Sequence, residues 1–247
     1  MNQVFNDLYN VIWKNVLPEI EVLDIEKFRE LFTKDLLLPA KYQCSINGED
    51  VYGLPEYNYK RFIGDTERTK RMNEGNGLQP KRPLDKLYDV LAAVRDVAYF
   101  RGSKSLNSEV IEASDNIYSS SYIYNSAFIH GSTKLMFCRD MGPNEYMLAS
   151  KNSKNCSFGI RVLDCDSVSS SFEVSFAAKC SNSFFCHNCF DLRDCMFCFD
   201  INSKQYCIAN IQLEEAEYKT LKQNLLTEYF SQLGLPGGFK TLSDIGQ

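Results

Sequence analysis

Small and apolar side chains recur at every third position through residues 108–210, and polar or aromatic side chains fill the places between them. The column begins with Ser and Ile in alternation, as in Ser108, Ile111, Ser114 and Ile117. Nine of the ten cysteines belong to this stretch and all nine fall on the column, which chance would produce about once in several thousand sequences. The pattern is therefore a true repeat.

A strict period of three fits neither an α-helix nor an isolated strand. The alternation of Ser and Ile makes the fuller unit six residues long, which suits a β-solenoid with one inward side chain per triplet and with Asn, Asp, Gly and Ser at the corners. We expect about three such units per coil, and about six coils stacked at about 4.8 Å into a rod of about 30 Å. Collagen would need Gly in every triplet, and a disordered segment would be less apolar. The sequence thus predicts a mainly β fold, a single-stranded β-solenoid (β-helix) with helical caps.

The core ladder is the set of column residues that we expect to fill the bore of this solenoid, with cysteine serving as a small buried apolar residue. Its predicted members are Ile117, Ile123, Ile129, Cys138, Cys156, Cys165, Cys180, Cys189, Cys198 and Cys207.

The chain divides into three regions by pattern. They are a helical and irregular N-terminal region with a docking arm (1–104), the solenoid (105–211), and a C-terminal capping helix with a tail (212–247). Helical spacing of apolar residues predicts two pieces within 4–33 and further helices over 84–100 and 213–233. We expect the last two to cover the first and last coils, because an open solenoid end exposes apolar core and unpaired backbone. Asn47-Gly48 predicts a hairpin between KYQCSI and DVYGL.

Several phenylalanines near the end of the repeat fall on outward positions, which suggests a face covered by another domain or subunit. They are Phe184, Phe185, Phe190, Phe197 and Phe199. The tail PGGFKTLSDIGQ has no helical pattern, and we expect an extended arm that docks on a neighbouring chain.

One local basic zone lies in an otherwise acidic protein. The net charge of −5 argues against nucleic-acid binding by the whole surface. Between residues 60 and 82 the sequence is polar and lacks an apolar pattern, which predicts a long loop. The loop is either simply solvated or binds a partner. That partner would be an acidic protein surface or, through a weak contact, a nucleic-acid backbone. The candidate partner-binding residues are Lys60, Arg61, Arg68, Lys70, Arg71, Lys81 and Arg82.

The cysteine usage and the N-terminus bear on the compartment. The first residues, MNQVFNDLYNVIWKN, do not read as a signal peptide, and no apolar run approaches membrane-spanning length, so we expect no membrane partner. A chain this long has no need of a disulfide scaffold. We therefore expect an intracellular, reducing compartment during synthesis.

Two CxxC pairs, Cys186–Cys189 and Cys195–Cys198, are the sharpest candidate for chemistry, because paired CxxC knuckles commonly hold zinc. The gap between the pairs is shorter than the usual spacing of about 12 to 20 residues, and the triplet column alone explains all four cysteines. We therefore favour a structural ladder and expect no cofactor, with zinc as the alternative.

No catalytic set emerges from the remaining residues. His130 and His187 are the two histidines, both at outward positions, and neither a phosphate-binding loop nor a dinucleotide glycine fingerprint is present. Solenoid sugar hydrolases place carboxylates on an outer face, but the acids near the repeat end fit corner positions better than a paired site. They are Asp164, Asp166, Asp191, Asp194 and Asp200.

The segment CSNSFFCHNCFDLRDCMFCFDINSKQYCIANIQLEEAEYKTL resembles a group of uncharacterised Cys/Asn-rich repeat proteins of uncultivated bacteria and large phages. Their repeats also read CxxC and CxNC in triplets and end in an Asn-Lys-x-Tyr-like segment before an acidic helix, matched here by Asn202, Lys204, Tyr206 and the helix that starts near Glu214. The resemblance covers about residues 138–225 and implies a solenoid without a known activity. The N-terminal zinc ribbon of many group members has no counterpart here, since Cys44 is the sole cysteine of the first 100 residues.

These observations favour a noncatalytic structural protein that docks onto other protein subunits of a large assembly, with a phage or virus particle, and hence the virion, as its expected place. A zinc-binding regulatory or nucleic-acid-associated module is the first alternative. A solenoid enzyme acting on polysaccharide is the second.

Overall fold

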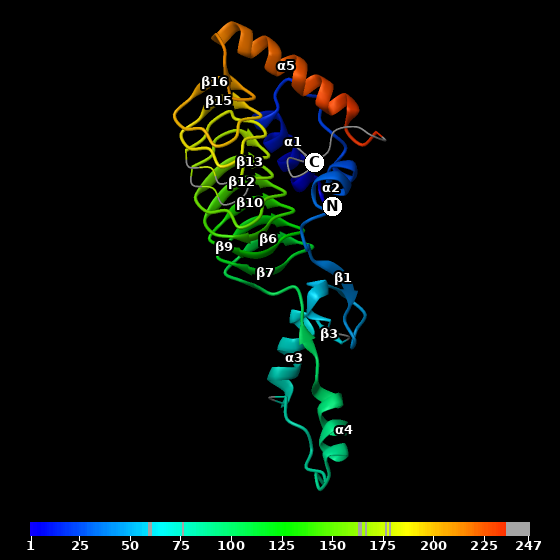
Figure 1. Ribbon diagram of the computed structural model, residues 1–247. Helices are drawn as coiled ribbons and strands as arrows, with labels where there is room; N and C mark the ends of the chain where they lie inside the picture. Colours follow the sequence, from blue (N-terminus) through cyan, green and yellow to red (C-terminus); the bar gives the residue numbers. More distant parts are fainter. Residues whose placement is uncertain are drawn as a thin grey trace.

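The computed structural model is a β-solenoid with helices along one flank and an appendage at one end (Figure 1). It describes residues 1–58, 61–75, 77–162, 165, 167–175, 177 and 179–235. The prediction of a mainly β fold with helical caps is therefore confirmed.

The elements follow one another as a helical start, a small β unit, a helical arm, the solenoid strands and a final helix. The helices are α1 (Gln3–Val16), α2 (Ile25–Phe32), the short 3-10 helix η1 (Pro55–Tyr57), α3 (Asp65–Gly75), α4 (Leu87–Val97) and α5 (Glu215–Gln232). The strands before the solenoid are β1 (Ala40–Gln43), β2 (Asp50–Gly53), β3 (Phe62–Ile63) and β4 (Phe100–Arg101). The solenoid strands are β5 (Ser105–Leu106), β6 (Glu109–Glu112), β7 (Asp115–Tyr118), β8 (Ser121–Tyr124), β9 (Ala127–His130), β10 (Thr133–Met136), β11 (Arg139–Met141), β12 (Asn144–Leu148), β13 (Cys156–Ile160), β14 (Ser171–Phe172), β15 (Arg193–Met196), β16 (Gln205–Ile208) and β17 (Ile211–Gln212).

Each coil holds two six-residue units, so the expectation of three units per coil is wrong. Thr133 pairs in parallel with Ser121 in the coil before it and with Glu145 in the coil after it, and the step between Ser121 and Thr133 is 12 residues. One unit contributes a strand to the sheet β14-β13-β12-β10-β8-β6, and the next contributes a strand to the sheet β11-β9-β7-β5. About eight turns result, rather than six, and at about 4.8 Å per turn they give a rod of about 38 Å.

The serines of the column occupy the corners, where they complete the backbone hydrogen bonding. Ser120 Oγ donates to the Tyr118 carbonyl (2.7 Å) and accepts the Ser132 N–H of the next coil (3.1 Å). At the opposite corner Ser126 Oγ accepts the Cys138 N–H (2.9 Å). A corner breaks the sheet ladder, and a buried N–H without a partner is costly, so a side-chain acceptor at each corner stabilises the turn. This requirement explains why serine alternates with an aliphatic residue along the column.

Every third residue along most of the solenoid has a left-handed backbone, and it directly precedes a column residue. Asn116, Asn125 and Asp140 hold such positions with φ of 61°, 42° and 55°. Short polar side chains tolerate this conformation, as the corner prediction assumed. Phe128 and Phe137 also adopt it, with φ of 55° and 56°, although a bulky residue pays about 1–2 kcal/mol there. The ladder bonds of the neighbouring coils hold these residues in the strained conformation.

All ten predicted core-ladder residues lie in one buried cluster that fills the bore. Gly159 also stands on the column, and a Cβ built there would lie 2.6 Å from Val162 Cγ2 and 3.0 Å from Met147 Cε. The larger neighbours in the bore therefore occupy the space that a side chain at this position would need.

A second core lies outside the solenoid, between its flank and the helices α1, α2 and α5. Phe185 is fully buried, stacks on Phe197 one coil further on (4.7 Å between ring centroids) and meets Tyr229 of α5 (4.8 Å). Phe28 of α2 lies 6.1 Å from Phe137 by the same measure. The expectation that another domain or subunit covers the outward phenylalanines is thus corrected in part, because the chain's own helices cover Phe185 and its neighbours.

The segment that follows α2 is fixed to successive coils by polar side chains. Asn125 Nδ2 donates to the Pro39 carbonyl (3.2 Å), and Arg139 Nη1 donates to the Leu37 carbonyl (2.8 Å). Arg161 Nη1 donates to the Phe32 carbonyl at 2.6 Å. These contacts place the N-terminal helices in register with the coils.

The predicted hairpin and caps of the N-terminal region are present. β1 and β2 pair antiparallel across Asn47-Gly48, and Gly48 has a φ of 76°. The Asp24 side chain accepts the N–H groups of Glu26 and Lys27 and so caps α2.

The expected loop over 65–83 is wrong in part, because residues Asp65–Gly75 form α3. The helix could not be predicted from apolar spacing, because its residues are mostly polar and form no apolar stripe. The prediction that the helix near 84–100 covers the first coil is also wrong. Instead, α3 and α4 extend away from the solenoid as an arm, while α5 crosses the opposite end (Figure 1).

Candidate docking surface

The arm comprises residues 61–101 and begins and ends on one short parallel pair of strands. Phe62 of β3 pairs with Phe100 of β4, so both ends of the arm meet at its base. Arg101 forms an ion pair with Asp65 at the first turn of α3, with one N–O distance of 2.6 Å, and this hydrogen bond raises the pKa of Arg101. The paired ends make the arm a closed hairpin of two helices rather than an open loop.

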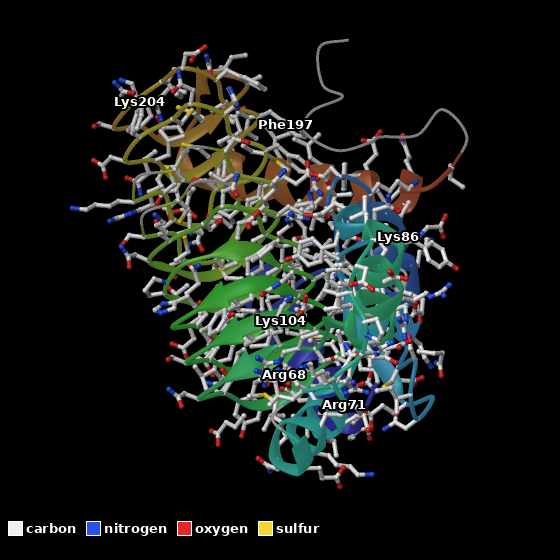
Figure 2. All side chains as sticks on the ribbon, turned by 90° about the horizontal axis from the view of Figure 1, so that it is seen from below. Arg68, Arg71, Lys86, Lys104, Phe197 and Lys204 are labelled. Carbon is white, nitrogen blue, oxygen red and sulfur yellow. The ribbon has the colours of Figure 1, made fainter. Side chains whose placement is uncertain are left out.

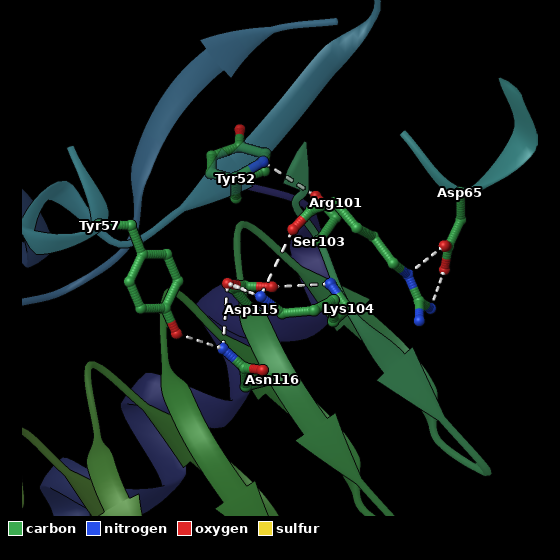
Figure 3. A network of polar contacts seen from close by, with 8 residues as sticks. All are labelled: Tyr52, Tyr57, Asp65, Arg101, Ser103, Lys104, Asp115 and Asn116. Atoms are coloured by element: carbon green, nitrogen blue, oxygen red, sulfur yellow. Dashed lines mark hydrogen bonds and ion pairs between the residues drawn. The ribbon is translucent and has the colours of Figure 1, made fainter. Parts of the chain in front are cut away.

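A buried polar junction ties the base of the arm to the first coil (Figure 3). Ser103 exchanges two hydrogen bonds with Tyr52 of β2: Tyr52 N donates to Ser103 Oγ (2.9 Å), and Ser103 N donates to the Tyr52 carbonyl (2.6 Å). Asp115 of β7 accepts the Lys104 N–H (2.8 Å), and its other oxygen lies 3.2 Å from Lys104 Nζ. Burial raises the pKa of Asp115, although the contacts with Lys104 oppose that rise.

The small β unit completes this junction. Asn116 Nδ2 donates to the Tyr57 hydroxyl at 3.0 Å, and the Lys104 ammonium lies 5.1 Å from the centroid of the Tyr57 ring. The chain therefore enters the solenoid through a network whose members come from β2, η1, α3 and the first coils. Such a network fixes the direction of the arm, because its groups have satisfied partners in a low-dielectric setting.

Arginines gather around one aromatic ring at the base of the arm. The guanidinium carbons of Arg61 and Arg71 lie 4.1 Å and 4.9 Å from the centroid of the Tyr99 ring. Arg68 and Arg71 project from α3 in the view from below (Figure 2) and line a hollow of about 190 Å³ with Tyr99 and Arg101. In the described part of the chain, no carboxylate lies within ion-pair distance of Arg68 or Arg71. These side chains can therefore meet an acidic group of a partner.

The other predicted basic residues do not join this cluster. Lys70 is exposed on α3, while Lys81 and Arg82 lie exposed on the far part of the arm. Arg82 is already paired with Asp96 at 3.0 Å. Lys60 lies outside the described residues.

Several large apolar side chains of α4 are exposed to solvent. None of the 11 residues of α4, all of which the structure describes, is buried. Leu87, Tyr88 and Leu91 keep 73%, 76% and 57% of their surfaces exposed, and Leu84 before the helix keeps 54%. Isolated apolar residues are common on surfaces, but several on one helix make it a candidate interaction surface.

The four cysteines of the zinc alternative are buried column residues of the solenoid. Each thiol donates to the carbonyl two residues earlier, as Cys189 Sγ does to His187 (3.1 Å) and Cys195 Sγ does to Arg193 (3.4 Å). Burial raises the pKa of Cys189, which disfavours its thiolate, whereas hydrogen bonds with the Cys186 and Cys195 thiols lower the pKa of Cys198. Among the described residues, no three His, Cys, Asp or Glu side chains are arranged to hold a metal ion.

The acids of the polysaccharide alternative stand at outward corners. Asp191 and Asp200 are exposed and accept hydrogen bonds from side chains in the adjacent coil, Ser203 (3.5 Å) and Asn188 (2.6 Å). Asp164 and Asp166 lie outside the described residues, as does the C-terminal tail that was expected to dock on a neighbour.

Comparison with known proteins yields no relative: no family model, no curated protein and no solved structure matches the chain. No helix within the described residues has the length and apolar character to span a bilayer. What the chain can bind must therefore be argued from its own surface.

Sequence reasoning located the basic zone but missed the residues that organise it. Tyr99, Arg101 and Tyr57 carried no motif, because their roles depend on contacts with residues distant in sequence. The apolar spacing predicts α4, and an apolar stripe usually indicates a buried helix face. The residues before α4 are polar and supply no second apolar stripe that could pack against it. That absence was the sign in the sequence that α4 would be exposed.

Proposed function

We propose that this chain is a noncatalytic assembly protein whose rigid solenoid carries the arm as a docking element for other protein subunits. The observation that supports this most directly is the exposed apolar face of α4, on the same arm as the arginines of α3 that have no carboxylate partner. A protein surface with an apolar patch and a flanking acidic rim would match both features. The resemblance of the repeat to phage-encoded proteins makes a phage or virus particle the proposed assembly.

The arm is suited to this task because its base is fixed. The ion pair of Arg101 with Asp65 and the junction at Asp115 hold it at a set direction relative to the coils. A preorganised docking element loses less conformational entropy when it binds than a flexible loop would. The solenoid then acts as a spacer of defined length between the arm and the end covered by α5.

The test is association with the native assembly by sedimentation and size-exclusion chromatography from the producing cells. Leu91→Lys should lower the amount of chain bound to particles at least tenfold. It should leave thermal stability unchanged, since Leu91 is exposed. Val11→Lys is the matched control, because Val11 is a helix residue of α1 that is 51% exposed and lies outside the arm. A strictly monomeric wild-type chain that never accompanies a particle contradicts the proposal.

The basic cluster supports weak nucleic-acid contact as a second candidate, because Arg61, Arg68 and Arg71 converge on Tyr99. Cationic groups beside an aromatic ring suit a phosphate backbone with unstacked bases. Electrophoretic mobility shifts with single-stranded DNA at several salt concentrations would detect it. A shift that Arg68→Gln and Arg71→Gln do not weaken would count against this candidate.

A further inference from the structure

A cavity of about 430 Å³ lies far from the arm, between the end of α1, the first half of α5 and the solenoid flank. Its walls are largely apolar and include Leu17, Ile20, Leu226 and Phe184. The volume falls within the range of small-molecule sites, about 300–1,000 Å³. Three separate elements supply the walls, so the cavity exists only in the folded chain.

Charged residues also line this space: Lys222, Lys219 and the exposed Glu19, and of the two lysines Lys222 is the one without a paired carboxylate. Lys222 Nζ lies 4.4 Å from the centroid of the Phe184 ring. Within the described residues, no carboxylate lies within ion-pair distance of Lys222, whereas its neighbour Lys219 is paired with Glu215. Burial lowers the pKa of Lys222, and the more distant Asp194 only partly opposes this. A half-buried cation without an anion is unfavourable, and an anionic ligand would relieve that cost.

We propose that this cavity binds a small amphiphilic carboxylate, with the carboxylate on Lys222 and an aliphatic chain along Leu17, Ile20 and Leu226. One ammonium without a paired carboxylate, beside largely apolar walls, matches one carboxylate with an apolar body. It does not match a phosphate, which needs several donors. A medium-chain fatty carboxylate fits both the charge and the walls. This site is independent of the docking function proposed for the arm.

The single tryptophan offers a direct reporter. Trp13 Nε1 donates to the carbonyl of Ile20, which lines the cavity (3.3 Å), and the Trp13 ring lies 5.5 Å from that of Phe230 on α5. A chain seated against Ile20 should alter the surroundings of the indole. We therefore expect a saturable change in tryptophan fluorescence when octanoate is added to the purified full-length protein.

Three comparisons test the assignment. Lys222→Met should weaken octanoate binding at least tenfold, and octanol should bind at least tenfold more weakly than octanoate to the wild type. Lys219→Met is the matched control, because this lysine lines the same cavity but is ion-paired, and it should change the affinity less than threefold. Gln223→Trp keeps the ammonium and narrows the cavity, so it should also reduce binding.

The outcome that overturns the proposal is equally direct. It fails if wild-type protein gives no saturable response to octanoate or decanoate, or if Lys222→Met binds as tightly as wild type. Equal binding of octanol and octanoate would also overturn it, since the ammonium would then contribute nothing. Thermal melts guard against misfolding, and Lys222→Met should be at least as stable as wild type because it removes a half-buried charge that has no carboxylate partner.

Discussion

Truncation of one residue in the bore measures how the coils hold one another. Leu135 is fully buried and stands between Ile123 in the coil before and Met147 in the coil after. Leu135→Ala removes three carbons, which costs about 2.4 kcal/mol at ~0.8 kcal/mol per buried CH₂. The ladder hydrogen bonds fix the spacing of the coils, so the neighbours cannot close the cavity. The total loss should therefore reach about 4 kcal/mol, in the upper part of the range for such truncations.

The assay is urea unfolding followed by circular dichroism for the coils and by fluorescence of Trp13 for the helical flank. Repeat proteins can unfold in parts, so coincidence of the two transitions must be established before a free energy of unfolding is assigned. Leu106→Ala is the matched control, because Leu106 lies on β5 and is 61% exposed, and it should cost less than about 0.5 kcal/mol. If Leu135→Ala costs no more than this control, the bore is not the packed core described above.

Two further predictions concern ion pairs made by two arginines of the solenoid, Arg161 and Arg139. Arg161 lies 3.4 Å from Glu173, a carboxylate that is 2% exposed, so Arg161→Gln should lower the free energy of unfolding by about 3 kcal/mol. The double variant Arg161→Met with Glu173→Leu leaves no unpaired charge and should recover part of that loss. Urea titrations that show no recovery would refute the pairing. The hydrogen bond from Arg139 lowers the pKa of Glu56, so the stability from this pair is present above the unfolded-state pKa of Glu56 and is lost as the pH falls through the lower folded-state value. Arg139→Gln should cost about 1 kcal/mol at pH 7, and unfolding curves measured down the acid range should converge with those of wild type; a constant difference would contradict this.

The triplet column was readable from the sequence because it records a local requirement. Each triplet must place one small or aliphatic side chain in the bore, and this demand repeats without reference to distant residues. The ladder cysteines share one buried cluster for that reason. The alternation of Ser with Ile had the same origin. Only the hydrogen bonds of Ser120 and Ser126 show that the serines stand at the corners of the coil and the isoleucines along its sides.

The number of units per coil was not readable, because two or three units would repeat the same six-residue pattern. The pairing of Thr133 with Ser121 and Glu145 settles it, and pairing partners are a property of the folded chain. The position of α4 was equally out of reach. An amphipathic stripe predicts that a helix has an apolar face, but it does not say which surface covers that face or whether any does.

The sequence by itself determined the solenoid, its column and the existence of the main amphipathic helices, because each follows from side-chain periodicity within a short window. Tertiary structure alone decided that Arg61, Arg71 and Tyr99 meet at the base of the arm and that Lys222 faces an apolar cavity. These groups come from segments whose relative placement is fixed by long-range packing and polar contacts. No local pattern encodes that placement, so the contacts that build the basic cluster and the cavity emerge only from the folded chain.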